Sequence, residues 1–484
     1  MYHILATASL VLLFSHSGSA FDLRSLTRRS SAGSGIGFVH VPVHRTAQKS
    51  NGTPVIRRRA SGKYSAVDLD NLSNGYSIDI SIAGQETSVI LDTGSSELWV
   101  DPDCSTAARG NITDSDDISG NEVGSPEYCE SIGRYDPGSS STSENLEEGD
   151  VFVYADLTTI ELNYYTDNID IGGLQISGQQ FGVANATNAT ALGIMGMGPN
   201  GAYGYNSSSQ PYSLILDSMA SQGLIASRAF SLDLKNYDNA TGSIIFGGLD
   251  KKKFQGSLQT LPLESPQMSL GIYGDGSSDD RQTSYGYFVT VQSLSMTKPN
   301  DTSSSKYDQD KFLAVLDSGT SAILTPEGIS SQICEDVGGT EMTQSGSSFC
   351  VVPCDIKDQP GGLDVAFDGK TIRVSFENLL TESVQNGNTF CFLGVGDTGV
   401  ATDPPTYILG SPFLRAAYAV FDWDNQQVHL AQASDCGSNV VAIGTGTGAV
   451  PTGGGCKESA SLLSIPRSVG AVWAVALASI LFLI

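Results

Sequence analysis

One pattern of eight residues occurs twice in this chain and constrains its fold more than any other feature. Residues 89–96 read Val-Ile-Leu-Asp-Thr-Gly-Ser-Ser, and residues 314–321 read Ala-Val-Leu-Asp-Ser-Gly-Thr-Ser. An apolar segment that includes Gly follows each copy further along the chain, at residues 191–196 and 407–412. The repeat predicts two half-molecules of one design, related by a pseudo-twofold axis, which each contribute one Asp loop to a shared cleft.

The Asp of each copy, Asp92 or Asp317, ends an apolar strand, where a carboxyl group must be hydrogen-bonded or neutral. The glycine of each motif allows a backbone N–H to approach the carboxylate, and the outer hydroxyl can donate to it. The inner hydroxyls can bond across to the opposite loop. The residues expected to hold the pair in this way are Thr93, Gly94, Ser95, Ser318, Gly319 and Thr320.

Two carboxyl groups a few ångströms apart cannot both ionise, so Asp92 and Asp317 are expected to share a proton and titrate as one unit. The ionised member can accept a proton from a water held between them, while the other protonates a substrate carbonyl. This chemistry hydrolyses an amide at acidic pH without a metal, a cofactor or a covalent intermediate.

Alternation of apolar and polar residues indicates strands, for example at residues 76–82 and 287–291. Short alternating segments and Gly-rich turns continue along the chain. One helix is expected at residues 212–222, because Pro211 suits its first turn and Gly223 its end. The predicted fold class is therefore all-β, meaning mostly β with a few short helices.

At 484 residues the chain is too long for one compact core, so we expect two lobes, residues 60–255 with Asp92 and residues 256–435 with Asp317. The net charge of −26 excludes a nucleic-acid-binding protein, because phosphate binding needs Lys and Arg. Eight cysteines without metal spacing favour disulfides in an oxidising compartment over zinc. We expect a monomer.

The N-terminal end carries two processing signals. Residues 1–20 have an apolar run and then small residues, which is typical of a secretory signal peptide; a buried N-terminal helix is the alternative. Residues 21–59 hold eight Lys or Arg and one Asp and end in three arginines. We interpret them as a prosegment that covers an acidic cleft by Coulomb attraction until cleavage after Arg59; the alternative is a disordered basic arm.

The C-terminal end is interpreted as an anchor signal. Residues 436–460 are rich in Gly, Ser and Thr and are expected to form a stalk, and residues 461–484 end in sixteen uncharged residues. Small residues, a polar spacer and an apolar tail match a GPI-anchor signal, with a plain tail anchor as the alternative. Ser459 is the preferred attachment site, and Gly454 is the second choice.

Glycosylation sequons support the secretory route, since each one that is used marks an exposed surface. They begin at Asn71, Asn111, Asn185, Asn188, Asn206, Asn239 and Asn300, with one more at Asn51 in the basic segment.

These motifs together resemble the pepsin-like aspartic proteases, and most of all the GPI-anchored yapsin-like group of fungi. The resemblance covers residues 76–431 and includes the segments 91–100, 316–321 and 408–415. It implies a bilobal double β-barrel, Asp92 and Asp317 as the catalytic pair, and protein or peptide substrates.

The family also has a hairpin flap whose Tyr closes over the substrate, and the resemblance assigns this role to Tyr154. The family's usual Gly after that Tyr is replaced here by Ala155. Trp99 matches the residue that hydrogen-bonds the flap Tyr, with core packing as the alternative. Asp156 matches a position linked to accepting Lys before the scissile bond, with a solvated turn as the alternative.

The resemblance also selects disulfides. Cys354 matches Cys391, and Cys104 with Cys129 closes an acidic insertion like that of yapsin-like enzymes. The remaining cysteines are Cys334, Cys350, Cys436 and Cys456, taken as the pairs 334–350 and 436–456. The acidic insertion suggests a preference for basic residues in substrates; solvated surface is the alternative.

The function predicted from the sequence is a secreted, cell-surface-anchored aspartic endopeptidase. The alternative is a catalytically inactive cell-wall glycoprotein that retains the fold.

Overall fold

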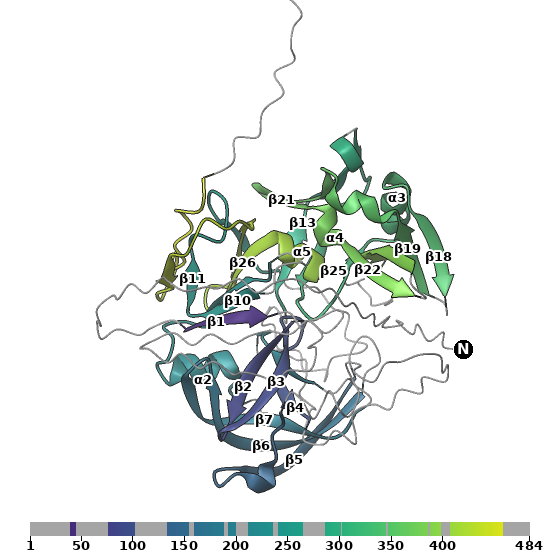
Figure 1. The fold of residues 1–484 in the computed structure, drawn as a ribbon. Helices are drawn as coiled ribbons and strands as arrows, with labels where there is room; N and C mark the ends of the chain where they lie inside the picture. The colour runs from purple at the N-terminus through teal and green to yellow at the C-terminus, as the bar shows by residue number, and fades with distance from the viewer. Residues whose placement is uncertain are drawn as a thin grey trace, which may run out of the picture.

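The computed structural model describes residues 39–44, 76–101, 133–153, 159–187, 192–199, 212–235, 241–264, 286–301, 303–344, 347–385, 388–397 and 407–457. Figure 1 shows two lobes, a lower one coloured blue and teal and an upper one coloured green, with strands between them. The α-helices of the described residues are short: α2 (Ile215–Ser221), α3 (Ile329–Asp336), α4 (Phe376–Leu379) and α5 (Ser411–Ala416). The predicted mostly-β, bilobal fold is confirmed.

The strands of the N-terminal lobe form a closed barrel. They are β2 (Ser77–Ile82), β3 (Gln85–Asp92), β4 (Leu98–Val100), β5 (Glu144–Val153), β6 (Thr159–Ile171), β7 (Leu174–Thr187) and β8 (Gly193–Gly196). The order is β2-β3-β8-β4-β7-β6, pairing of β2 with β6 closes the barrel, and β5 extends it beyond β6. Ile78, Ile80 and Ile82 are buried, as their alternation predicts.

The described residues of the C-terminal lobe form three sheets. One has the order β13-β16-β25-β17-β24, with β13 (Phe288–Val291), β16 (Phe312–Leu316), β17 (Ile323–Thr325), β24 (Val395–Asp397) and β25 (Tyr407–Leu409). The second has β14 (Ser293–Thr297), β15 (Ser304–Lys306), β20 (Gly362–Phe367) and β21 (Lys370–Val374). The third has β18 (Thr340–Gln344), β19 (Ser347–Val352), β22 (Leu380–Gln385) and β23 (Asn388–Leu393).

The two Asp loops lie in matching positions of the two lobes. In each lobe, the strand before the Asp pairs antiparallel on one side, as β2 with β3 and β13 with β16. On its other side it pairs parallel with the downstream apolar segment, as β3 with β8 and β16 with β25. That segment then pairs antiparallel with the strand after the loop, β4 or β17. The sequence repeat thus corresponds to a repeat of topology.

A sheet between the lobes takes strands from both. Its order is β12-β27-β26-β9-β10-β1, continuing into β2 of the barrel. The strands are β1 (Val39–His44), β9 (Ala229–Asp233), β10 (Thr241–Phe246), β12 (Gln259–Pro262), β26 (Ala417–Asp422) and β27 (Gln427–Gln432). Phe230 of β9 stacks on Phe421 of β26 with ring centroids 4.6 Å apart. The hydrophobic core therefore continues from one lobe into the other.

Strand β1 belongs to the basic segment ahead of residue 60. It pairs antiparallel with β10 over the whole of residues 39–44, and His44 also pairs with Ser77 of β2. Part of the segment interpreted as a prosegment is thus built into the sheet between the lobes by backbone hydrogen bonds.

Residues 436–457 correct the expectation of a stalk that begins at residue 436. Strand β28 (Val440–Ala442) pairs with β11 (Gly248–Asp250), and a disulfide joins Cys436 to Cys456. Ile443 and Val450 are buried in a cluster with Leu249, Phe254 and Tyr418. The apolar residues among the glycines explain the difference, because they need a partner surface. We call residues 436–457 the C-terminal extension.

The expected helix at residues 212–222 is confirmed as α2, which is slightly shorter. The side chain of Asp217 accepts a hydrogen bond from the backbone N–H of Leu214 at 3.1 Å, and Gly223 follows the helix with a φ of +72°.

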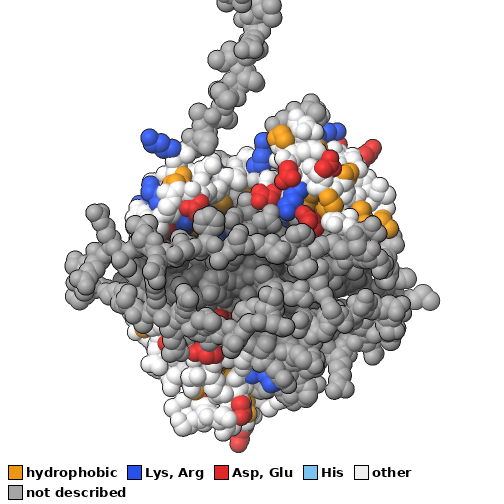
Figure 2. All heavy atoms as spheres, in the orientation of Figure 1, with side chains coloured by type: hydrophobic (Ala, Val, Ile, Leu, Met, Phe, Trp, Pro, Cys, Tyr) orange, Lys and Arg blue, Asp and Glu red, His pale blue; other side chains and the backbone are white. Residues whose placement is uncertain are grey.

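On the face shown in Figure 2, acidic and basic side chains are interspersed over the described part of the C-terminal lobe.

Candidate active site

The two Asp loops meet face to face between the lobes. Asp92 is the last residue of β3, Asp317 directly follows β16, and they are 7% and 9% exposed. A Cβ added to Gly94 would lie 2.6 Å from Cγ of Asp317, and a Cβ added to Gly319 would lie 2.5 Å from Oδ1 of Asp92. Each glycine therefore leaves the space that the opposite carboxyl group occupies.

Each carboxyl group accepts the same two hydrogen bonds from its own loop. The N–H of Gly94 donates to Oδ1 of Asp92 at 2.8 Å, and the Ser95 hydroxyl donates to Oδ2 at 2.5 Å. In the other loop the N–H of Gly319 donates to Oδ1 of Asp317 at 2.8 Å, and the Thr320 hydroxyl donates to Oδ2 at 2.6 Å. These bonds fix the orientation of both carboxyl groups.

The inner hydroxyls lock the loops to each other. The Thr93 hydroxyl donates to the carbonyl of Leu316 at 2.8 Å and accepts from the N–H of Ser318 at 2.9 Å. The Ser318 hydroxyl donates to the carbonyl of Leu91 at 2.7 Å and accepts from the N–H of Thr93 at 3.1 Å. All four bonds are buried, so the expected reciprocal contact between the loops is present.

Burial raises the pKa of Asp92 strongly, and the nearby carboxyl group of Asp317 raises it further. The hydrogen bonds from Ser95 and Gly94 act in the opposite direction but are weaker. Two buried carboxyl groups in this geometry favour the state with one proton between them.

The downstream apolar segments support the loops from behind. The N–H of Met197 donates to the carbonyl of Asp92 at 2.7 Å, and the N–H of Gly198 donates to that of Ser95 at 2.7 Å. In the other lobe the N–H of Ser411 donates to the carbonyl of Thr320 at 2.8 Å. A Cβ added to Gly410 would lie 2.2 Å from the Ala322 carbonyl oxygen, which is why this segment contains glycine.

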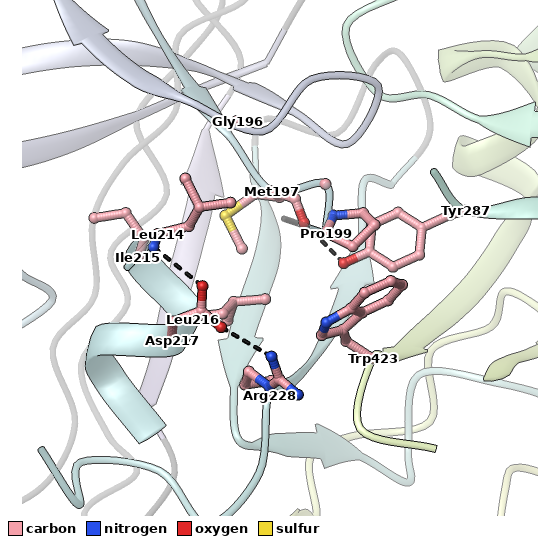
Figure 3. A pocket seen from close by; sticks show the side chains of 11 residues that line it. Gly196, Met197, Pro199, Leu214, Ile215, Leu216, Asp217, Arg228, Tyr287 and Trp423 are labelled. Atoms are coloured by element: carbon pink, nitrogen blue, oxygen red, sulfur yellow. Dashed lines mark hydrogen bonds and ion pairs between the residues drawn. The ribbon is translucent and has the colours of Figure 1, made fainter. Parts of the chain in front are cut away.

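A small pocket lies behind the Asp92 loop, and neither Asp92 nor Asp317 lines it (Figure 3). The Tyr287 hydroxyl donates to the carbonyl of Met197 at 2.8 Å. Arg228 pairs with Asp217 at 3.0 Å and with Asp424 at 2.7 Å. These contacts join residues of both lobes behind the loop.

Trp99 lies in β4 and is 1% exposed. It packs with Ile160 and Leu162 of β6 and with Ala184 of β7. Trp99 therefore packs inside the barrel, and its hydrogen bond to the flap Tyr stays a prediction. Tyr154 and Asp156, the expected flap residues, lie outside the described residues.

Three disulfides of the expected pairing are present: Cys334–Cys350, Cys354–Cys391 and Cys436–Cys456. Asn185 and Asn300 are exposed, as glycosylation requires. The other site residues predicted from the sequence lie outside the described residues: Cys104, Cys129, Asn51, Asn71, Asn111, Asn188, Asn206, Asn239 and Ser459.

Glu97 is a buried acidic residue close to the Asp92 loop, and no sequence motif predicted a role for it. In the sequence Glu97 stands between a Ser pair and the apolar residues 98–100. An acidic residue next to apolar residues was the sequence signal that could have marked it as buried.

Among the described residues, no group of three or more His, Cys, Asp or Glu is placed to hold a metal ion.

A family model described as eukaryotic aspartyl protease matches residues 75–433. The chain is 32% identical over 411 residues to a probable aspartic-type endopeptidase (opsB) of Aspergillus oryzae, covering 82% of this chain and 77% of that protein. It is 32% identical over 388 residues to an acid protease of Saccharomycopsis fibuligera (79% and 87% covered). It is 30% identical over 386 residues to candidapepsin-3 of Candida albicans (78% and 84% covered).

Among solved structures, the aspartic proteinase from Irpex lacteus matches with a TM-score of 0.55 and 18% identity. The match covers 76% of this chain and 97% of that chain. At this level of identity the match shows a shared fold.

Proposed function

This chain belongs to the eukaryotic aspartyl protease family and is an aspartic-type endopeptidase, and we propose that it acts at the cell surface at acidic pH with Asp92 and Asp317 as its catalytic pair. The observation that carries the assignment of these residues is the matching set of hydrogen bonds around both carboxyl groups. Two carboxyl groups held alike, each against the glycine of the opposite loop, are suited to share one proton.

In the proposed mechanism a water lies between the two carboxyl groups. The ionised carboxylate accepts a proton from this water as the water oxygen bonds to the carbonyl carbon of the substrate, and the protonated carboxyl donates its proton to the carbonyl oxygen. The carboxyl group that took the proton from water then donates it to the amide nitrogen, the other carboxylate accepts a proton from a hydroxyl of the diol, and the C–N bond breaks to release an acid and an amine. The pair is restored with one proton.

The pH preference is proposed from the need for one shared proton. Burial and Asp317 raise the pKa of Asp92, so the pair keeps its shared proton on the acidic side of this raised value and loses it, and with it activity, as the pH rises further. A protease named for acidity, the acid protease of Saccharomycopsis fibuligera, is among the relatives.

Secretion and anchoring are proposed from the two ends of the chain. A relative from Candida albicans is named secreted aspartic protease 3, and the disulfides of this chain suit an oxidising compartment. No helix of the described residues is long and apolar enough to span a membrane. We propose that residues 461–484 act as a GPI-anchor signal with attachment at Ser459, which would hold the enzyme at the plasma membrane or cell wall.

The basic segment is proposed to keep the enzyme latent. With cleavage after Arg59, the remaining chain has 18 basic and 51 acidic residues, so the segment and the body carry opposite charge. Pairing of β1 with β10 supports a segment that is held on the body before cleavage.

We also propose a preference for basic residues in substrates. The negative charges of Asp156 and the acidic insertion would attract the positive charge of a substrate Lys or Arg.

The test of the catalytic assignment is hydrolysis of a denatured protein at acidic pH by the processed enzyme. Asp92→Asn and Asp317→Asn should each lower kcat/KM by about a thousandfold, because general acid–base catalysis needs both groups. Asp310→Asn, at an exposed Asp shortly before β16, is the matched control and should retain activity. Full activity in either of the first two variants would refute the assignment.

A further inference from the structure

Tyr287 of the C-terminal lobe forms hydrogen bonds with chain segments that support both Asp loops. It directly precedes β13, and its side chain is fully buried. Its backbone carbonyl accepts from the N–H of Leu316, the residue before Asp317, at 3.1 Å. Its hydroxyl reaches the N-terminal lobe and donates to the carbonyl of Met197 at 2.8 Å (Figure 3). One residue therefore links the strand that carries Asp317 to the segment behind Asp92.

The peptide group between residues 197 and 198 connects Tyr287 to the Asp92 loop. Its carbonyl accepts from the Tyr287 hydroxyl, and its N–H, which belongs to Gly198, donates to the carbonyl of Ser95 at 2.7 Å. The N–H of Met197 donates to the carbonyl of Asp92 at 2.7 Å. Because hydrogen bonds in a chain strengthen and orient one another, the Tyr287 hydroxyl contributes to fixing the Asp92 loop.

Aromatic packing holds the ring of Tyr287 in place. Phe230 of β9 and Phe421 of β26 meet the ring edge to face, with ring centroids 6.1 and 4.6 Å away. Both strands belong to the sheet between the lobes. The ring is therefore confined by this sheet, and its hydroxyl is kept at the carbonyl of Met197.

The Tyr287 hydroxyl remains a hydrogen-bond donor at acidic and neutral pH. Burial is the main cause that raises its pKa; the charges of Asp217 and Asp422 raise it further, while that of Arg228 lowers it. The hydroxyl therefore keeps its proton over the whole range in which a pair of carboxyl groups titrates. Any pH dependence that changes when this hydroxyl is removed must come from other groups.

Tyr76 stands at the matching position of the N-terminal lobe. Its backbone carbonyl accepts from the N–H of Leu91, the residue before Asp92, at 2.7 Å, just as that of Tyr287 accepts from Leu316. Within the described part of the chain, only Tyr287 of the two has a hydroxyl bonded to the other lobe. The backbone contact thus belongs to the repeated design, and the hydroxyl contact is an addition to it.

We propose that Tyr287 is a positioning residue, whose hydroxyl on Met197 keeps the carboxyl group of Asp92 aligned with that of Asp317. The proposal rests on the proposed function, because this alignment matters for a reaction only if the two carboxyl groups act together. Sharing a proton and holding a water both need a fixed separation, and a displacement of about 1 Å can cost about a hundredfold in rate.

The first test is Tyr287→Phe, which keeps the ring and removes only the hydroxyl. The kcat should fall by about tenfold and KM should stay within about twofold of the wild type, because the rest of the substrate-binding surface is unchanged. The pH profile of kcat/KM should become narrower, since carboxyl groups that are held less closely couple less strongly and their two apparent pKa values approach each other.

Tyr418→Phe is the matched control for a purely structural loss. The Tyr418 hydroxyl is also fully buried, donates to the Ser231 hydroxyl at 2.9 Å and accepts from the N–H of Asp250 at 2.7 Å. Tyr418 packs in the cluster that the C-terminal extension covers. Its removal should lower the melting temperature about as much as Tyr287→Phe, because each variant loses one buried hydroxyl, but should leave kcat and the pH profile unchanged.

Hydrogen exchange of the Gly198 amide tests the link without activity. Its protection should fall by about tenfold or more in Tyr287→Phe and stay at the wild-type level in Tyr418→Phe. Gly198→Ala is a second variant in case Tyr287→Phe does not fold. An added Cβ would lie 2.7 Å from the carbonyl oxygen of Ser95, so the peptide group must move away from the Asp92 loop. This variant should show the same lower kcat and narrower pH profile.

The proposal is overturned if Tyr287→Phe keeps the kcat and pH profile of the wild type, or if it changes them no more than Tyr418→Phe does. If Tyr287→Phe does not fold, a Gly198→Ala enzyme with wild-type kcat and pH profile overturns it. A wild-type enzyme without activity would instead count against the proposed function. Exchange of the Gly198 amide would then decide on the link alone, and protection that is equal in Tyr287→Phe and the wild type would overturn it.

Discussion

Single residues decide how closely the two Asp loops approach. Gly94 and Gly319 each lie against the opposite carboxyl group, and the hydroxyls of Thr93 and Ser318 hold the two loops together. These roles could be predicted from the sequence because each motif is local and occurs twice. Glu97 could not be assigned, because its partner Tyr164 is 67 residues away and only the closed barrel brings them together.

At this scale we predict that Gly94→Ala nearly abolishes activity. The added methyl group would lie 2.6 Å from Cγ of Asp317, so the loops must separate. We expect a loss of more than about a hundredfold in kcat/KM and about 1–3 kcal/mol in the free energy of unfolding. Gly453→Ala is the control, because a Cβ there meets no atom within 4 Å. An active Gly94→Ala enzyme would contradict the close approach of the loops.

At the scale of elements, periodicity and the repeat predicted the strands that carry the Asp loops. The C-terminal extension was not predicted as folded, because its Gly, Ser and Thr content is also that of a linker. Its structure depends on distant partners: the carboxylate of Asp250 accepts from the Ser438 hydroxyl at 2.7 Å and from the N–H of Asn439 at 2.7 Å. The pairing of β1 with β10 was missed for the same reason.

We predict that the Cys436–Cys456 disulfide stabilises the folded enzyme. The bond joins residues 20 positions apart, and a loop of this size contributes about 3 kcal/mol. Replacing both cysteines by Ser should therefore lower the melting temperature and increase proteolytic cleavage between residues 436 and 457. A melting temperature equal to that of the wild type would instead indicate that the extension behaves as the stalk first expected.

At the scale of the whole molecule, the free energy of unfolding depends on pH through two kinds of carboxyl group. In one kind the folded structure raises the pKa, and in the other it lowers the pKa. The pKa of Asp92 is raised by burial and by Asp317, and that of Glu97 is raised by burial. The contribution of Asp92 is fully present below a pH of about 3.8 and that of Glu97 below about 4.5, and both are lost as the pH rises towards 8. The pKa of Asp435 is lowered to about 2, chiefly by hydrogen bonds from Lys253 and Gly437 that outweigh its desolvation. That contribution is lost as the pH falls below about 4.

We therefore predict a maximum of stability near pH 4–5 and a decline towards neutral pH. The decline should reach about 1.4 kcal/mol per pH unit for each group that is ionising, and repulsion within the acidic body adds to it. Thermal unfolding from pH 3 to pH 8 measures it, and added salt should restore the repulsive part only. Stability that rises between pH 5 and pH 8 would contradict the assigned pKa shifts.

The central claim is that Asp92 and Asp317 act as one unit, and the most direct test is kcat/KM of the double variant Asp92→Asn/Asp317→Asn beside the two single variants. Because either substitution already removes the shared proton, the account predicts that the double variant is no slower than the slower single variant. Losses that multiply, so that the double variant is slower by the product of the two single effects, would show that the two carboxyl groups act independently.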